Sequence, residues 1–206
     1  MFKDSDIFEK HYEDYMRQIM QTDVLSLKDI LGIKGDADQM MVPFFDRKYS
    51  ISKNGILDGS GNRPHYMVCV ILAKYILHSP DRPHDEPEWV SFKDFKRTSH
   101  FLNVNFFSSD TEHAIAKAFS GRKEALNTAC ENLGGHGREV EFSYDISMAF
   151  EALPRVSLLL LYNDVDDEFP AQCKVLFQKH SEFYLDPESL IMTSAYLAKR
   201  LQGSKI

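Results

Sequence analysis

The sequence has few cysteines and lacks the spacings that mark common catalytic and cofactor sites. Its three cysteines, Cys69, Cys130 and Cys173, are far apart, with no CxxC pair and no Cys/His ligand spacing. This argues against a disulfide framework and against a zinc or iron–sulfur site made by this chain alone. Walker, HExxH and GxSxG motifs are also missing, so no motif encodes a cofactor or a nucleophile.

Excess positive charge and long apolar runs are missing as well. The net charge is −7, which argues against non-specific binding to nucleic acid. The longest apolar stretches, Tyr66–Leu77 and Val156–Tyr162, are too short to cross a bilayer. The charged start of the sequence does not resemble a signal peptide. The odd number of scattered cysteines also suggests that the thiols are reduced. Together these features predict a cytoplasmic protein that binds neither nucleic acid nor membrane.

Aromatic and aliphatic residues are plentiful. Hydrophobic residues make up 43% of the 206 positions, and 15 residues are Phe, enough for a sizeable core. We expect a single domain over residues 1–206, although two small domains remain open. Apolar residues at helical spacing predict an amphipathic helix over residues 5–21. Its aromatic stripe is either a core face or a surface for a partner helix, and the helix can be peripheral.

The first half of the chain also contains strand and helix patterns. Residues Met40–Phe45 and Lys48–Lys53 are typical of strands, and Asn54-Gly55 favours a hairpin turn. Pro64 is expected in the first turn of a buried helix that ends near His78. Cys69 within that helix is interpreted as a small core residue.

Two helix starts are predicted from Ser followed three residues later by an acid, the capping-box pattern. Ser26 with Asp29 indicates a short helix that Gly32 ends. Ser109 with Glu112 indicates a helix that ends at Gly121, followed by a second helix over Lys123–Leu133.

The second half predicts a meander of three or four antiparallel strands. Apolar and polar residues alternate from Val140 to Glu151, which indicates a strand with one wet face. The run Val156–Tyr162 is apolar on both faces and is expected to be central, with Cys173–Phe177 beside it. Asp186 followed by Pro187 indicates the start of a last helix, Pro187–Leu201. The predicted class is α+β, with an antiparallel or mixed sheet and helices packed on it.

Charged and aromatic side chains that flank these strands are the candidate ligand-binding residues. Arg155 precedes the central strand and can clamp an anion or pair with Glu151 or Glu168. The acids from Asp164 to Glu168 form either a hard-cation site or a charged hairpin turn. The predicted ligand-binding set, which includes no metal ligand and no catalytic residue, is Trp89, His100, Arg155, Asp166 and Glu168.

The loop Ser79–Pro87 and the residue after it carry an imidazole and several carboxylates, His84, Asp85, Glu86 and Glu88. The simplest interpretation is a solvated loop, and a metal site would need ligands from elsewhere.

Several blocks of the sequence resemble a known family. The blocks are WVSFKDF (89–95), AKAFSGRKEALNTACENLGG (116–135), FEALPRVSLLLLYNDVDDEFPAQCKVLF (150–177) and YLDPESL (184–190). In this order they resemble the uncharacterised bacterial and archaeal family called domain of unknown function 3786, found largely in anaerobes. Some members carry a four-cysteine iron–sulfur module like that of corrinoid proteins, which implies a role near corrinoid or redox one-carbon metabolism. This chain lacks that module, and the family has no assigned catalytic residue to carry over.

We therefore expect a non-catalytic binding or accessory protein with a small-molecule or protein partner. The alternative is a small-molecule enzyme whose His, carboxylate and Arg side chains converge only in the folded chain. His84 or His100 with Asp166, Glu168 and Arg155 would then form the site.

Overall fold

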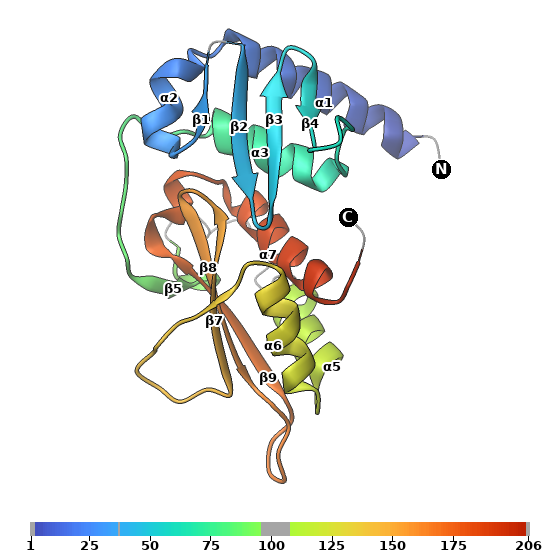
Figure 1. Cartoon of the computed structure of the whole chain (residues 1–206), viewed down its shortest axis with the longest axis vertical. Helices are drawn as coiled ribbons and strands as arrows, with labels where there is room; N and C mark the ends of the chain where they lie inside the picture. Colours follow the sequence, from blue (N-terminus) through green and yellow to red (C-terminus); the bar gives the residue numbers. More distant parts are fainter. Residues whose placement is uncertain (1–2, 37, 96–107, 205–206) are drawn as a thin grey trace.

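The computed structural model describes residues 3–36, 38–95 and 108–204. Two antiparallel sheets, with helices beside each, form the α+β fold that was predicted (Figure 1). One large buried cluster contains side chains from both sheets and from the helices. Among the described residues, no helix is both long and apolar enough to cross a membrane.

The first sheet has the order β1-β2-β3-β4. Its strands are β1 (Lys34–Gly35), β2 (Gln39–Phe44), β3 (Arg47–Ser52) and β4 (Gly55–Leu57). Both predicted strands are confirmed, and the hairpin after them pairs Ser52 with Gly55. The turn residues are therefore Lys53 and Asn54, one position earlier than the Asn-Gly pattern indicated.

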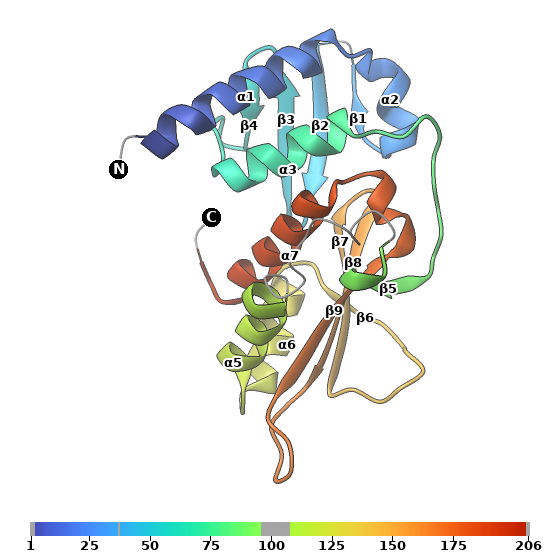
Figure 2. The same ribbon diagram turned by 180° about the vertical axis from the view of Figure 1, so that it is seen from behind.

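Helices α1 (Lys3–Gln21) and α3 (Tyr66–Leu77) lie side by side over one face of this sheet (Figure 2). α2 (Val24–Leu31) lies at the β1 side. α3 is the buried helix that was predicted, and Cys69 is fully buried within it. It begins later than predicted, because Pro64 lies before the helix and not in its first turn. His65 is the N-cap, and its ring accepts a hydrogen bond from the Met67 amide at 3.3 Å.

The second sheet has the order β5-β9-β8-β7-β6. Its strands are β5 (Trp89–Ser91), β6 (His136–Gly137), β7 (Ile146–Leu153), β8 (Val156–Asn163) and β9 (Gln172–Gln178). β8 is central, as its apolar run predicted, and the C-terminal meander is confirmed. The β8–β9 hairpin projects from the lower end of the molecule in Figure 1.

The helices α5 (Ala114–Phe119), α6 (Lys123–Asn132) and α7 (Pro187–Leu201) pack against one face of the second sheet. Short 3₁₀ segments, Phe92–Asp94 and Lys179–Phe183, follow β5 and β9. α7 begins as predicted, since Asp186 Oδ1 accepts a hydrogen bond from the Ser189 amide at 2.8 Å.

The predicted long strand over Val140–Glu151 is wrong in its first half, because β7 begins only at Ile146. The preceding residues form a loop whose Val140 and Tyr144 pack on the second face of the sheet, against Ala149, Leu159 and Leu161. Phe142 between them is 70% exposed. The apolar positions in this part of the pattern therefore belong to a loop that places Val140 and Tyr144 on the sheet and leaves Phe142 exposed.

The capping box predicted at Ser26 is also wrong. α2 has Asp23 as its N-cap, and the Ser26 hydroxyl donates to the Asp23 carbonyl at 2.7 Å. The segment Ser108–His113 is a π-helical turn before α5, and Glu112 accepts the Val175 amide of β9 at 3.0 Å. Glu112 therefore connects a helix to the sheet, a long-range contact that the capping pattern does not contain.

Two hairpin tips join the two sheets. The Phe45 amide, at the tip between β2 and β3, donates to the Ala152 carbonyl of β7 at 2.9 Å. In the other direction, Pro154 and Arg155 at the tip between β7 and β8 lie against the end of α2 near Gly32. The tip between β2 and β3 is also fixed to α7 by an ion pair between Asp46 and Arg200, 2.9 Å long.

Candidate functional site

The residues predicted to bind a ligand do not meet at one place. Arg155 precedes β8, whereas Asp166 and Glu168 follow it. An eight-residue strand is roughly 26 Å long, so the cation and the acids lie at opposite ends of the sheet. The predicted His, carboxylate and Arg constellation is therefore not assembled among the described residues.

Arg155 forms neither of the ion pairs that were predicted for it. Its Nε atom donates to the Ile30 carbonyl at 3.1 Å, and Nη2 donates to the Asp29 carbonyl at 3.0 Å. These carbonyls belong to the last turn of α2, where helical partners run out. The guanidinium thus caps a helix from a distant hairpin.

The acidic turn after β8 is held by its own carboxylates. Asp166 Oδ1 accepts the amides of Glu168 and Phe169 at 2.8 and 2.7 Å. Asp164 accepts the Gly121 amide at 2.6 Å and the Lys123 amide at 3.3 Å, at the start of α6. Hydrogen bonds from backbone amides hold the pKa of Asp164 below its usual range, although burial opposes them. Asp164 and Asp166 are thus structural, and Glu168 is exposed.

The remaining predicted residues that the structure describes, Trp89 and His84, lie apart from Arg155 and from the acidic turn. Trp89 is half-buried on the second face of the second sheet, beside Leu176. His84 stacks on Phe183 with ring centroids 3.9 Å apart, and the Tyr184 hydroxyl accepts the His84 amide at 2.8 Å. His100 lies outside the described residues. Ligand binding by the predicted set, Trp89, His100, Arg155, Asp166 and Glu168, stays a prediction.

Burial keeps the cysteine thiols protonated, as expected for residues that pack in the core. Burial raises the pKa of Cys69 to about 11 and that of Cys130 to about 12, so both thiols stay protonated near neutral pH. Cys173 is shifted in the same direction by burial. Within residues 3–36, 38–95 and 108–204, no group of three His, Cys, Asp or Glu side chains is placed to hold a metal ion.

A groove of about 940 Å³ lies between α1, α3 and the start of α7. We call it the helical groove. Most of its wall is apolar or aromatic, and Ile7 and Tyr66 are 55% and 49% exposed there. Its lining is Ile7, Phe8, His11, Tyr15, Tyr66, Met67, Val70, Lys74, Asp186, Glu188, Ser189 and Met192.

α1 and α3 run in the same direction along the helical groove. Phe8 meets Tyr66 edge to face at 5.1 Å, and eight residues on along α3 Lys74 lies 5.6 Å from the Tyr15 ring centroid. Eight helical residues span roughly 12 Å, which gives the length of the groove. One end is therefore aromatic and the other end is charged.

The charged end is an ion pair. Lys74 Nζ lies 3.1 Å from Asp186 Oδ2, and both side chains are partly exposed. Burial favours a raised pKa for Asp186, but the Ser189 amide and hydroxyl and the Lys74 ammonium outweigh it and lower the pKa. For Lys74, burial lowers the pKa, and the bond to Asp186 outweighs it and raises the pKa. Both groups are thus charged at neutral pH.

α1 is fixed by specific contacts. The Tyr12 hydroxyl accepts the Ile56 amide of β4 at 2.9 Å. Arg63 forms two hydrogen bonds to the Glu9 carboxylate, at 2.9 and 2.8 Å, and its guanidinium lies 3.8 Å from the Tyr12 ring centroid. The aromatic stripe predicted on this helix therefore has two roles, since part of it packs and part of it forms a wall of the groove.

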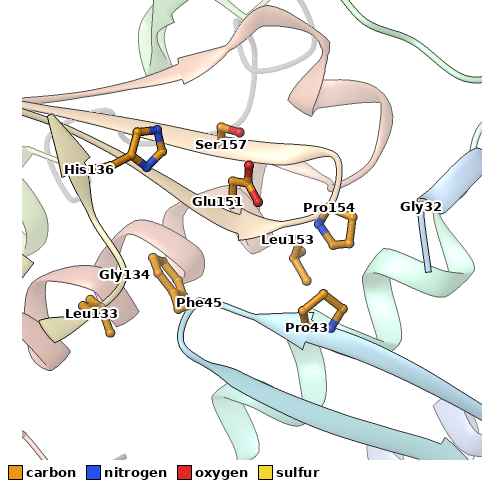
Figure 3. A pocket seen from close by; sticks show the side chains of 10 residues that line it. All are labelled: Gly32, Pro43, Phe45, Leu133, Gly134, His136, Glu151, Leu153, Pro154 and Ser157. Carbon is orange, nitrogen blue, oxygen red and sulfur yellow. The ribbon is translucent and has the colours of Figure 1, made fainter. Parts of the chain in front are cut away.

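A second cavity, of about 570 Å³, lies where the two sheets meet (Figure 3). We call it the junction cavity. It lies between the β2–β3 tip, the β7–β8 hairpin and the end of α6. Its lining is Gly32, Pro43, Phe45, Leu133, Gly134, His136, Glu151, Leu153, Pro154 and Ser157.

Comparison with known proteins places the chain in a family. The model of the family described as Domain of unknown function (DUF3786) matches residues 23–200. The chain belongs to this family. The resemblance seen in the sequence blocks is thereby confirmed. No curated protein and no solved structure matches the chain.

The two cavities differ in how far the DUF3786 match covers them. It begins after the end of α1, so one wall of the helical groove lies outside the matched residues. The junction cavity lies entirely within them. Neither cavity was predicted, because each is formed by residues distant in sequence. The sequence feature that could have indicated the helical groove is the apolar surface all around α3, which has to be buried by other elements on every side.

Proposed function

We propose that this protein is a non-catalytic binding protein whose helical groove takes a largely apolar small molecule with one hydrogen-bonding end. The observation that carries the proposal is the partly apolar groove itself, with Ile7 and Tyr66 about half exposed at its rim. An apolar pocket with a few convergent polar groups is the usual form of a small-molecule site.

Size and polarity support this class of ligand. The volume of about 940 Å³ falls within the range of roughly 300–1,000 Å³ common for small-molecule sites. Lys74 and Asp186 already neutralise each other, so a net charge on the ligand would gain little there. The Tyr15 and Ser189 hydroxyls and the spare Lys74 N–H groups suit an uncharged hydroxyl, amide or carbonyl.

The family resemblance extends the proposal to an accessory role near corrinoid or redox one-carbon metabolism in an anaerobe. Cys69, Cys130 and Cys173 lie on α3, α6 and β9, and this separation does not form a four-cysteine module. We therefore propose that the protein fulfils this role by binding a small molecule. A cytoplasmic location, suggested by the three thiols, belongs to the same proposal.

The enzyme alternative has less support. It needed Arg155 near Asp166 and Glu168, and these lie at opposite ends of β8. The binding interpretation needs no such convergence.

The test uses Nile red, an uncharged apolar dye whose fluorescence rises in an apolar site. Val70→Trp fills the helical groove from α3, and Met192→Trp fills it from α7. Val165→Trp, at an exposed position on the β8–β9 turn, is the matched control. We expect saturable binding to the native chain and to the control, and binding at least about tenfold weaker in both groove variants.

Circular dichroism and urea unfolding establish that each variant is folded before binding is compared. Unchanged Nile red binding in the two groove variants would contradict the proposal. So would an equal loss in the Val165→Trp control.

A further inference from the structure

Three polar side chains lie on one face of the second sheet, at the junction cavity. In β7, Glu151 is directly opposite Ser157 of β8, and Ala149 is opposite His136 of β6. Glu151 and Ser157 therefore have Cβ atoms about 5 Å apart, and His136 and Glu151 are diagonal neighbours at roughly 7–8 Å. Figure 3 shows all three among the lining side chains, with Glu151 beside Ser157.

These three groups are unpaired among the described residues. In the part of the chain that the structure describes, His136, Glu151 and Ser157 form no side-chain hydrogen bond, and Glu151 and His136 form no ion pair. Carboxylates at the other end of this sheet, by contrast, are occupied, as Asp145, Asp164 and Asp166 are. Glu151, Ser157 and His136 thus offer three free acceptors around one space.

The electrostatics of the junction cavity favour a cation. Glu151 is the only lining residue that is an acid, and Leu133 and Gly134 are at the C-terminal end of α6, where the helix dipole is negative. Arg155 lies near Gly32, but its guanidinium is bonded to the last carbonyls of α2 and offsets that helix end. Glu151 and the end of α6 therefore make the electrostatic potential in the junction cavity negative.

The other walls suit an alkyl chain. Pro43, Leu153 and Pro154 are apolar, and the half-buried ring of Phe45 stacks on Tyr196 at 5.4 Å. Phe45 has φ of +51°, a left-handed conformation that non-glycine residues rarely adopt. Its amide bond to Ala152 and its ring stacking hold this conformation, which fixes the ring at the cavity.

We propose that the junction cavity binds a small primary ammonium ion. The three N–H groups of such an ion match the carboxylate of Glu151, the hydroxyl of Ser157 and a ring nitrogen of His136. Its alkyl chain lies against the proline and leucine side chains, and Phe45 adds a cation–π contact. This site is separate from the helical groove and does not depend on the function proposed there.

The test is an NMR titration of the native chain with n-butylammonium, butyltrimethylammonium and butan-1-ol at matched ionic strength. The amide signals of Gly134 and Gly32 report the cavity. We expect saturable shifts with n-butylammonium, and binding at least about tenfold weaker with the other two probes, which lack either the N–H donors or the charge.

Glu151→Gln keeps the shape of the side chain and removes its charge. We expect it to weaken n-butylammonium binding about tenfold or more, whereas Glu141→Gln, at an exposed carboxylate on the neighbouring loop, leaves binding unchanged. Both positions are exposed, so neither change should unfold the chain. Equal binding of the three probes, no saturable shift, or an unaffected Glu151→Gln variant would each overturn the proposal.

Discussion

The Nε atom of Arg155 lies 3.1 Å from the carbonyl oxygen of Ile30, 125 positions earlier in the chain. The tip of the β7–β8 hairpin thereby closes the C-terminal end of α2, next to Gly32 in its left-handed conformation. The Tyr75 hydroxyl donates to the neighbouring Leu31 carbonyl at 2.6 Å. Three consecutive helix-end carbonyls are thus satisfied by side chains from the β7–β8 turn and from α3.

Removing the Arg155 side chain should destabilise the fold. Arg155→Ala leaves the Asp29 and Ile30 carbonyls without their donor, so we expect the free energy of unfolding to fall by about 1–3 kcal/mol. Arg155→Lys should be intermediate, because one ammonium lacks the two-pronged geometry. Urea unfolding measures both, with Arg138→Ala as the exposed control. A loss no larger than that of the control would show that these bonds contribute little.

Asp164 and Asp167 are close in sequence but should differ in their effect on stability. Asp164 accepts amides at the start of α6 and the Tyr162 hydroxyl at 3.0 Å, whereas Asp167 is an exposed turn residue. Asp164→Ala should lower the free energy of unfolding by about 1–2 kcal/mol. Asp167→Ala should stay within about 0.5 kcal/mol of the native chain in the same urea measurement. Equal effects would contradict the capping role of Asp164.

Local patterns predicted most of the elements and few of their contacts. The central position of β8 followed from an apolar run that needs cover on both faces, and the start of α7 followed from Asp186 and Pro187. Val140–Asp145 was mistaken for strand because a loop packed on a sheet can show the same alternation. The contact of Glu112 with the Val175 amide was not predicted, because the two residues are 63 positions apart in the sequence.

The sites were harder to predict than the fold for the same reason. Arg155 and the Asp164–Glu168 acids are close in sequence, but the intervening strand separates them by its whole length. Conversely, Phe8 and Met192 border one groove from opposite ends of the chain. Charge and periodicity indicate which residues need hydrogen-bond, ion-pair or packing partners. Only the register of the sheets determines which residues they contact.

Gly55 should tolerate no side chain. Its φ is +106°, and a Cβ atom there would lie 2.6 Å from the Tyr12 hydroxyl oxygen. Gly55→Ala should therefore lower the free energy of unfolding by about 1–3 kcal/mol. Gly59→Ala, where a Cβ meets nothing within 4 Å and φ is not in the left-handed region, should be close to neutral in the same urea assay.

The Tyr12→Phe change separates the two causes at Gly55. In that background the steric clash disappears but the backbone strain remains, so the cost of Gly55→Ala should shrink without vanishing. A cost at Gly55 equal to that at Gly59 would show that β4 shifts freely away from α1.

The ion pair between Lys74 and Asp186 should make stability depend on pH in a defined direction. The pKa of Asp186 is lower in the folded chain than its usual value of 3.8. A carboxyl with a lowered folded pKa stabilises the fold above its unfolded pKa, and this stabilisation is lost as pH falls through the folded pKa. The contribution should therefore be complete at neutral pH and decline below about pH 4.

Asp186→Asn isolates the charge, because Asn caps a helix about as well as Asp does. At neutral pH we expect it to be less stable than the native chain by up to about 1 kcal/mol, the range for partly exposed pairs. Urea unfolding across a pH series should show this difference narrowing as Asp186 is protonated. Asp186→Ala should cost about 1 kcal/mol more at every pH, since it also removes the cap of α7. A difference between the native chain and Asp186→Asn that persisted at low pH would contradict the ion-pair origin.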